Sequence, residues 1–283
     1  MLFMENKPIR SHPFCESHPI AAAILFLLAG IFLISIISSI LTIPLGLTIG
    51  DLYKISSFLS TGIASILFLL ALKRWFSPQY KGCVRSGMSR KNTMIALLPI
   101  FVYILYVLIE QLIESNFYFK PTLEALFMAL TAGIGEEAMF RASSIPIAMH
   151  YIRGNKRIWA VPLVTSAVFG FAHIVNMFGG ATAGNAVLQA IVTSMAGFYF
   201  GVLYVCTGSI LPGFLTHALF DFVCFAGDPT LVNGIMAGEL SLFSIISNFV
   251  STALLAAASV YLLKKFGPEM INHVWKSKWS QND

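Results

Sequence analysis

The sequence predicts an all-α, polytopic membrane protein of about eight transmembrane helices packed in one bundle. Of its 283 residues, 57% are hydrophobic and only 11% are charged, whereas soluble domains carry roughly 25% charged residues. Apolar stretches long enough to cross a bilayer recur along the whole chain. The basic residues lie between those stretches, as topology signals do. The formal net charge of +5 therefore does not indicate a nucleic-acid partner.

The first three apolar runs cover residues 19–45, 55–72 and 93–113. They follow a polar segment, 1–18, which we expect to be a short flexible tail in the cytoplasm. The first run is too long for the apolar region of a signal peptide and has no small-residue cleavage site close after it. We therefore expect it to form a membrane span.

Five further runs cover 122–151, 158–178, 186–206, 209–226 and 241–263. Pro121 suits the first turn of the fourth run. The GxxxG pattern from Gly197 to Gly201 in the sixth run is typical of close helix packing. We expect one membrane domain over 19–264, with its chemistry in 132–222. The basic tail, 265–283, would lie at the level of the lipid headgroups, anchored by its two tryptophans.

The distribution of Lys and Arg predicts the side of the membrane on which the termini lie. Eight spans put both ends of the chain on one side. That side holds two basic residues in the N-terminal tail, six between the second and third spans, three between the fourth and fifth, and four after the eighth. The other side holds only Lys54 and Lys120. Because positive residues favour the cytoplasm, we expect a cell-membrane protein with cytoplasmic termini.

The fourth run contains two adjacent carboxylates and an arginine, Glu136, Glu137 and Arg141. Charges within a bilayer are costly and normally face a bundle interior or a water-filled cavity. On a helix, Glu137 and Arg141 are four residues apart and can pair, so we interpret them as a structural pair. Glu136 points about 100° away and lacks such a partner. It is the candidate reactive carboxylate.

Polar side chains also interrupt the fifth and seventh runs, at His173 and at His217 with Asp221. The last two are four residues apart and share a helix face. At 1.5 Å per residue, Glu136 and His173 each lie about 22 Å from the expected cytoplasmic ends of their spans, and Asp221 and His217 about 18 and 12 Å. All four side chains can therefore occupy one layer of the bundle.

A cluster of this kind suits hydrolysis of a peptide bond. A carboxylate and an imidazole in a dry pocket can hold and deprotonate a water molecule, and a second imidazole can stabilise the resulting oxyanion. Glu136, His173 and His217 are also a reasonable set of zinc ligands, with a metal-bound water as the nucleophile. The sequence leaves both alternatives open, because it lacks HExxH and the ligands would come from three helices.

The motifs together resemble those of the CPBP family of intramembrane proteases, named for CAAX prenyl proteases and bacteriocin-processing enzymes. That family is marked by EExxxR, FxxxH and HxxxN or HxxxD on separate transmembrane helices. The motifs occur here as Glu136-Glu137 with Arg141, Phe169 with His173, and His217 with Asp221.

The resemblance implies a proteolytic site in which Glu136 activates water together with His173. His217 and Asp221 would position the substrate carbonyl or stabilise its oxyanion, and the other motif residues would support them. Asp221 is a departure, because Asn is commoner in the family and an ionised Asp would repel an oxyanion. Asp221 must therefore be protonated, orient a neighbour or bind a metal. Some relatives are described as metal-dependent, whereas the prenyl-protease branch is viewed as using glutamate without a metal.

The resemblance thus predicts an endopeptidase acting on a membrane-associated peptide or a lipidated protein, with no required cofactor or with zinc. In a prokaryote it points to peptide or bacteriocin maturation, or to self-immunity. Two other classes of function remain: a non-catalytic scaffold or immunity protein of the same fold, and a transporter. A transporter also places ionisable groups at mid-membrane, but it should show internal repeats or broken helix pairs, which we do not find in the sequence.

Overall fold

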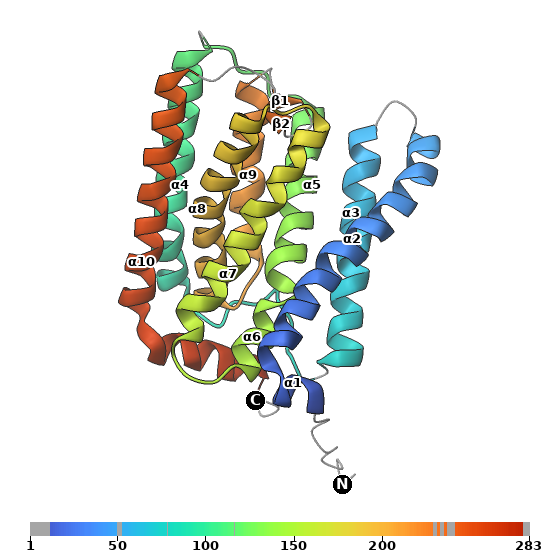
Figure 1. Cartoon of the computed structure of the whole chain (residues 1–283), viewed down its shortest axis with the longest axis vertical. Helices are drawn as coiled ribbons and strands as arrows, with labels where there is room; N and C mark the ends of the chain where they lie inside the picture. The colour runs from blue at the N-terminus through green and yellow to red at the C-terminus, as the bar shows by residue number, and fades with distance from the viewer. Residues whose placement is uncertain are drawn as a thin grey trace.

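A computed structural model of the chain describes residues 12–49, 53–77, 79–115, 117–228, 231–232, 235–236 and 241–279. The described chain forms an elongated helical bundle, and α1 and the C-terminal part of α10 lie at the same end of it (Figure 1). Among the described residues, six helices are long and apolar enough to cross a membrane. The prediction of a polytopic, all-helical membrane protein is therefore confirmed. Most of the predicted tail, residues 1–11, and residues 280–283 lie outside the described residues.

The elements occur in the chain as follows. The helices are α1 (Pro13–Ser17), α2 (Pro19–Ile49), α3 (Tyr53–Ala71), η1 (Leu72–Phe76), α4 (Arg90–Glu114), α5 (Leu123–Glu136), η2 (Glu137–Ala142), α6 (Ile145–Tyr151), α7 (Arg157–Ala172), η3 (His173–Gly179), α8 (Ala183–Thr207), α9 (Leu211–Gly227) and α10 (Leu242–Trp279). Two short antiparallel strands, β1 (Leu231–Val232) and β2 (Ile235–Met236), pair between α9 and α10.

Two predicted spans are not single α-helices. The fourth run is divided into α5, the π-helical turn η2 and α6, so the α-helix ends at Glu136 and the wider π-turn begins at Glu137. The fifth run changes from α7 to the 3₁₀-helix η3 at His173. Both changes fall within the predicted reactive motifs. Turns of this kind inside helices are frequent at functional sites because they redirect side chains.

Close packing of α7 against α8 fixes the wall of the bundle that carries His173. A Cβ atom on Gly170 would overlap Ser194 Oγ and the carbonyl oxygen of Ala190. One on Gly201 would lie 3.0 Å from Pro162 Cβ. The predicted packing role of the GxxxG pattern is thus confirmed at Gly201, where the missing side chain lets the two helix backbones approach.

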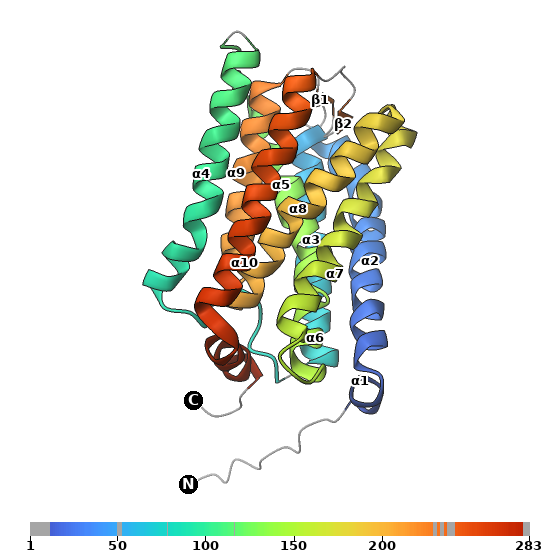
Figure 2. The ribbon, with the colours of Figure 1, turned by 60° about the vertical axis from the view of Figure 1, so that its left-hand side comes forward.

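The C-terminal part of α10 differs from the predicted headgroup-level tail. The helix bends at Gly267, whose φ is 67°, and the following segment turns beneath the bundle (Figure 2). Trp275 is only 2% exposed, and its Nε1–H donates to the carbonyl oxygen of Val205 at 2.7 Å. Lys278 Nζ donates to the carbonyl oxygen of Gly82 at 3.0 Å. Trp275 is therefore a core residue, because its indole N–H finds a partner inside the protein.

Candidate active site

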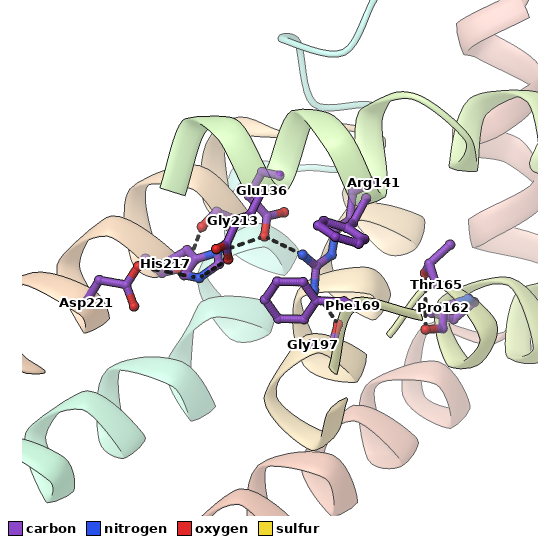
Figure 3. A network of polar contacts seen from close by, with 12 residues as sticks. Glu136, Arg141, Pro162, Thr165, Phe169, Gly197, Gly213, His217 and Asp221 are labelled. Atoms are coloured by element: carbon purple, nitrogen blue, oxygen red, sulfur yellow. Dashed lines mark hydrogen bonds and ion pairs between the residues drawn. The ribbon is translucent and has the colours of Figure 1, made fainter. Parts of the chain in front are cut away.

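The candidate active site lies where the end of α5, the turn η2, α7, α8 and α9 meet (Figure 3). The α5–α9 and α7–α8 pairs are among the most extensive helix contacts. Gly133 lets α5 approach α9, because a Cβ there would lie 3.0 Å from Ala218 Cβ. This approach brings the acidic motif next to the histidine of α9.

The Glu137–Arg141 pair forms the buried base of the site. Glu137 Oε1 lies 3.3 Å from Arg141 Nη1, and the two side chains are 1% and 0% exposed. Arg141 Nη2 also donates to the carbonyl oxygen of Gly197 at 3.2 Å, and its guanidinium lies 4.2 Å from the centre of the Phe169 ring. The predicted ion pair is present. The aromatic face adds a favourable cation–π contact in a desolvated place.

Gly197 permits this arrangement. A Cβ on Gly197 would lie 2.9 Å from Arg141 Nη2 and 2.7 Å from a ring carbon of Phe169. Figure 3 shows Arg141 above the Phe169 ring and next to Gly197. The first glycine of the GxxxG pattern therefore makes room for the arginine rather than for a neighbouring helix backbone.

His217 is the centre of the polar network. Its Nδ1–H donates to Glu137 Oε1 at 3.0 Å, and its ring stacks on Phe200 with centroids 4.7 Å apart. Its Nε2 faces two carboxylates, with Glu136 Oε2 at 3.5 Å and Asp221 Oδ2 at 3.6 Å. The contact between Nε2 and either carboxyl group is favourable only when one of the two partners carries a proton. The three groups therefore form a cluster of ion-pair contacts around a protonated His217, at distances longer than normal hydrogen bonds.

Glu137 has a second role that the sequence analysis did not predict. Because its Oε1 contacts both Arg141 and His217, it holds the ring orientation of the histidine as well as neutralising the arginine. Gly213 is also required, since a Cβ there would lie 2.9 Å from Glu137 Oε2. The spacing of Glu137 and Arg141 reveals the ion pair in the sequence, but no local pattern reveals the contact with α9.

His173 occupies a different place from the other three predicted residues. It is the first residue of η3, and its Nδ1–H donates to the carbonyl oxygen of Phe169 at 2.9 Å. Its ring meets the Phe169 ring edge-on, with centroids 4.8 Å apart. The bond at Nδ1 leaves Nε2 of the neutral ring as the acceptor. The structure thus brings Glu136, His217 and Asp221 into direct contact and places His173 on the wall of the cavity that they share.

This cavity has a volume of about 660 Å³, within the usual range for small-molecule sites. All four predicted catalytic residues line it: Glu136, His173, His217 and Asp221. The side chain of Glu136 is 29% exposed, whereas that of Glu137 is 1% exposed. Of the two adjacent carboxylates, Glu136 is therefore the one that a substrate can reach.

The three residues predicted as possible zinc ligands, Glu136, His173 and His217, are not arranged to bind one metal ion. Within the described residues, no group of three or more His, Cys, Asp and Glu side chains is arranged to hold one. Both histidines donate Nδ1–H, to Glu137 and to a backbone carbonyl, which leaves each Nε2 as the atom that would bind a metal. Glu136 and His217 meet, but His173 does not join them as a third ligand at one point.

Comparison with known proteins identifies the motif region. Residues 118–223 match the family model described as type II CAAX prenyl endopeptidase Rce1-like. This segment is therefore similar to an Rce1-like domain of the CPBP family. It covers α5 to α8 and most of α9, with all four predicted catalytic residues. Neither a curated protein nor a solved structure matches the chain significantly.

Proposed function

We propose that the protein is an intramembrane endopeptidase in which Glu136 takes a proton from a water molecule that attacks a peptide carbonyl. The observation that carries this proposal is the pairing of an accessible Glu136 carboxylate with a buried histidine, His217, at 3.5 Å. His217 is in turn fixed by Glu137 and Arg141. A base oriented by further hydrogen-bonded groups is typical of hydrolytic sites. The similarity to an Rce1-like domain supports the same reaction class.

The proposed reaction has two steps. The water oxygen first adds to the carbonyl carbon while Glu136 accepts a water proton, which gives a tetrahedral oxyanion. The C–N bond then breaks, and Glu136 returns the proton to the leaving amine. His173 lies on the cavity wall, where its Nε2 would accept a hydrogen bond from the attacking water and help Glu136 to orient it. His217, protonated at Nε2, would attract the Glu136 carboxylate 3.5 Å away and so hold it in place.

Asp221 acts in this scheme as a positioning residue for His217, since its Oδ2 lies 3.6 Å from Nε2. We expect Asp221→Asn to keep activity within about tenfold of wild type, and Asp221→Ala to lose about 10- to 100-fold, similar to losses when a supporting hydrogen-bond partner is removed. The reason is that Asn retains an oxygen acceptor of the same shape. Initial rates and their pH profile on one peptide check this. An inactive Asn variant beside an active Ala variant would contradict the proposed role.

The substrate in this proposal is a peptide or a lipidated protein at the membrane, and both termini are expected in the cytoplasm. Peptide maturation and self-immunity in a prokaryote are both compatible with such an activity. The charged and hydrogen-bonding side chains that line the cavity indicate which class of peptide it would bind.

The decisive experiment is cleavage of a peptide library by the purified protein in detergent. We expect wild type to yield products that Glu136→Ala does not yield. Glu124→Ala is the matched control, because Glu124 is an exposed carboxylate in the first turn of the same helix. Products that are equally abundant with wild type and Glu136→Ala would show that the proposed site does not cleave them.

A further inference from the structure

The cavity extends beyond the four candidate catalytic residues. Its lining also includes the end of α4, the residue after α9 and the first turns of α10, at Glu110, Glu114, Asp228, Ser244 and Asn248. These segments lie at the end of the bundle opposite α1 and the C-terminal part of α10 (Figures 1 and 2). Hydrolysis as proposed above uses none of these side chains.

The charge of the lining is strongly one-sided. The Asp, Glu, Lys and Arg residues of the lining are Glu110, Glu114, Glu136, Asp221, Asp228 and Lys54. Five carboxyl groups thus face one ammonium group, which already has an interaction of its own. A cavity lined by one sign of charge concentrates ligands of the opposite sign.

Glu110 is the residue that indicates a ligand. It is only 8% exposed, it lines the cavity, and its buried Oε1 has no hydrogen-bond partner. Glu114, one turn later, accepts from Ser244 Oγ at 2.8 and 2.6 Å and from Ser241 Oγ at 3.2 Å. A buried acceptor without a donor is costly. A donor supplied by a ligand would remove that cost.

The neighbouring residue, Gln111, also has a buried oxygen that could accept a hydrogen bond from a ligand. Gln111 also lines the cavity, and its buried Oε1 has no hydrogen bond of normal geometry. The neighbouring protein donors are the Ser247 hydroxyl for the Glu110 side chain and the Cys224 thiol, a weak donor, for Gln111. Among the described residues, neither buried oxygen is paired with a cation. An ammonium or guanidinium group carries several N–H donors and a positive charge, and no acceptor. It matches both the hydrogen-bonding and the electrostatic character of this part of the cavity.

We propose that Glu110, together with Gln111 and Glu114, forms a subsite for a lysine or arginine side chain of the substrate. The substrate class is then a cationic peptide, and this inference rests on the proposed endopeptidase function. A Cβ on Gly227 would lie 2.5 Å from Gln111 Oε1, so the subsite lies beside Gly227, which is six residues or about 9 Å along α9 from Asp221. An extended chain spans about 3.3–3.6 Å per residue. The basic residue therefore lies two to three positions from the cleaved bond.

The first test is sequencing of the products that wild type releases from a peptide library. We expect Lys and Arg to be enriched about tenfold at two to three residues from the cut, as for one charge-assisted contact. Glu110→Gln should lose that enrichment, and Glu110→Lys should replace it with Asp and Glu. Glu124→Gln is the matched control and should keep it, because Glu124 is exposed and outside the cavity lining. Cleavage without any preference for a basic residue would overturn the proposal.

The second test measures binding and needs no turnover. Two labelled apolar peptides that differ only by lysine or norleucine at the centre are titrated against Glu136→Ala. We expect the lysine peptide to bind about tenfold more tightly, and this difference to vanish in Glu136→Ala/Glu110→Gln. Equal binding of the two peptides would refute the subsite. Preferential binding of the lysine peptide without cleavage of any peptide by wild type would keep the subsite and refute the endopeptidase function.

Discussion

Replacing Glu136 with glutamine is expected to lower kcat/KM for a cleaved peptide by about 10²- to 10⁴-fold, the usual contribution of a general base. Glutamine has almost the same shape and still offers an oxygen to His217, whose Nε2 lies 3.5 Å from the Glu136 carboxylate. The glutamine amide, however, cannot accept the proton of the attacking water. The measurement is the initial rate at substrate concentrations well below KM, in detergent or in proteoliposomes.

The Tm of Glu136→Gln distinguishes a loss of catalysis from a loss of folding. Glu136 is 29% exposed, and His217 Nε2 also faces Asp221. Removing one of two like charges beside the same imidazole relieves repulsion, so Tm should stay the same or rise slightly. Functional residues are often retained at a cost in stability. A Glu136→Gln variant that kept a tenth or more of wild-type kcat/KM would contradict the assignment of Glu136 as the base.

Replacing Arg141 with methionine is expected to destabilise the fold by about 3–5 kcal/mol, the typical cost of removing one partner of a buried ion pair. Arg141 is fully buried, and Glu137 is 1% exposed. The variant leaves the Glu137 carboxylate without its cation and the carbonyl oxygen of Gly197 without its donor. We expect Tm in detergent to fall on the order of 10 °C.

The double variant Glu137→Gln/Arg141→Met tests the cause of that loss. It removes both charges, whereas the amide oxygen can still accept from His217 Nδ1, as Glu137 Oε1 does at 3.0 Å. If the unpaired buried charge is the main cost, the double variant should recover most of the Tm lost in Arg141→Met. A double variant no more stable than Arg141→Met would show instead that the loss comes from packing against Phe169, 4.2 Å from the guanidinium.

Much of the fold could be predicted because its signals are local in the chain. Apolar runs of membrane-spanning length correspond closely to α2, α4, α8 and α9, since a bilayer imposes a minimum length and excludes unpaired backbone polar groups. The Glu137–Arg141 pair was likewise predictable from its spacing of four residues. Charges within such runs also marked Glu136, His173, His217 and Asp221 as candidates, because lipid does not accept them.

The positions of these side chains relative to one another depend on contacts between helices. Nothing in the sequence near Glu137 predicts that it bonds His217 of α9, nor that the α-helix changes to a π-turn there. The bend at Gly267 and the burial of Trp275 likewise depend on the bundle surface that they meet. Local signals in the chain therefore identify the residues that must be kept from lipid. The partners of those residues depend on the packing of the bundle, because hydrogen bonds and close contacts between distant helices form only when the whole bundle is assembled.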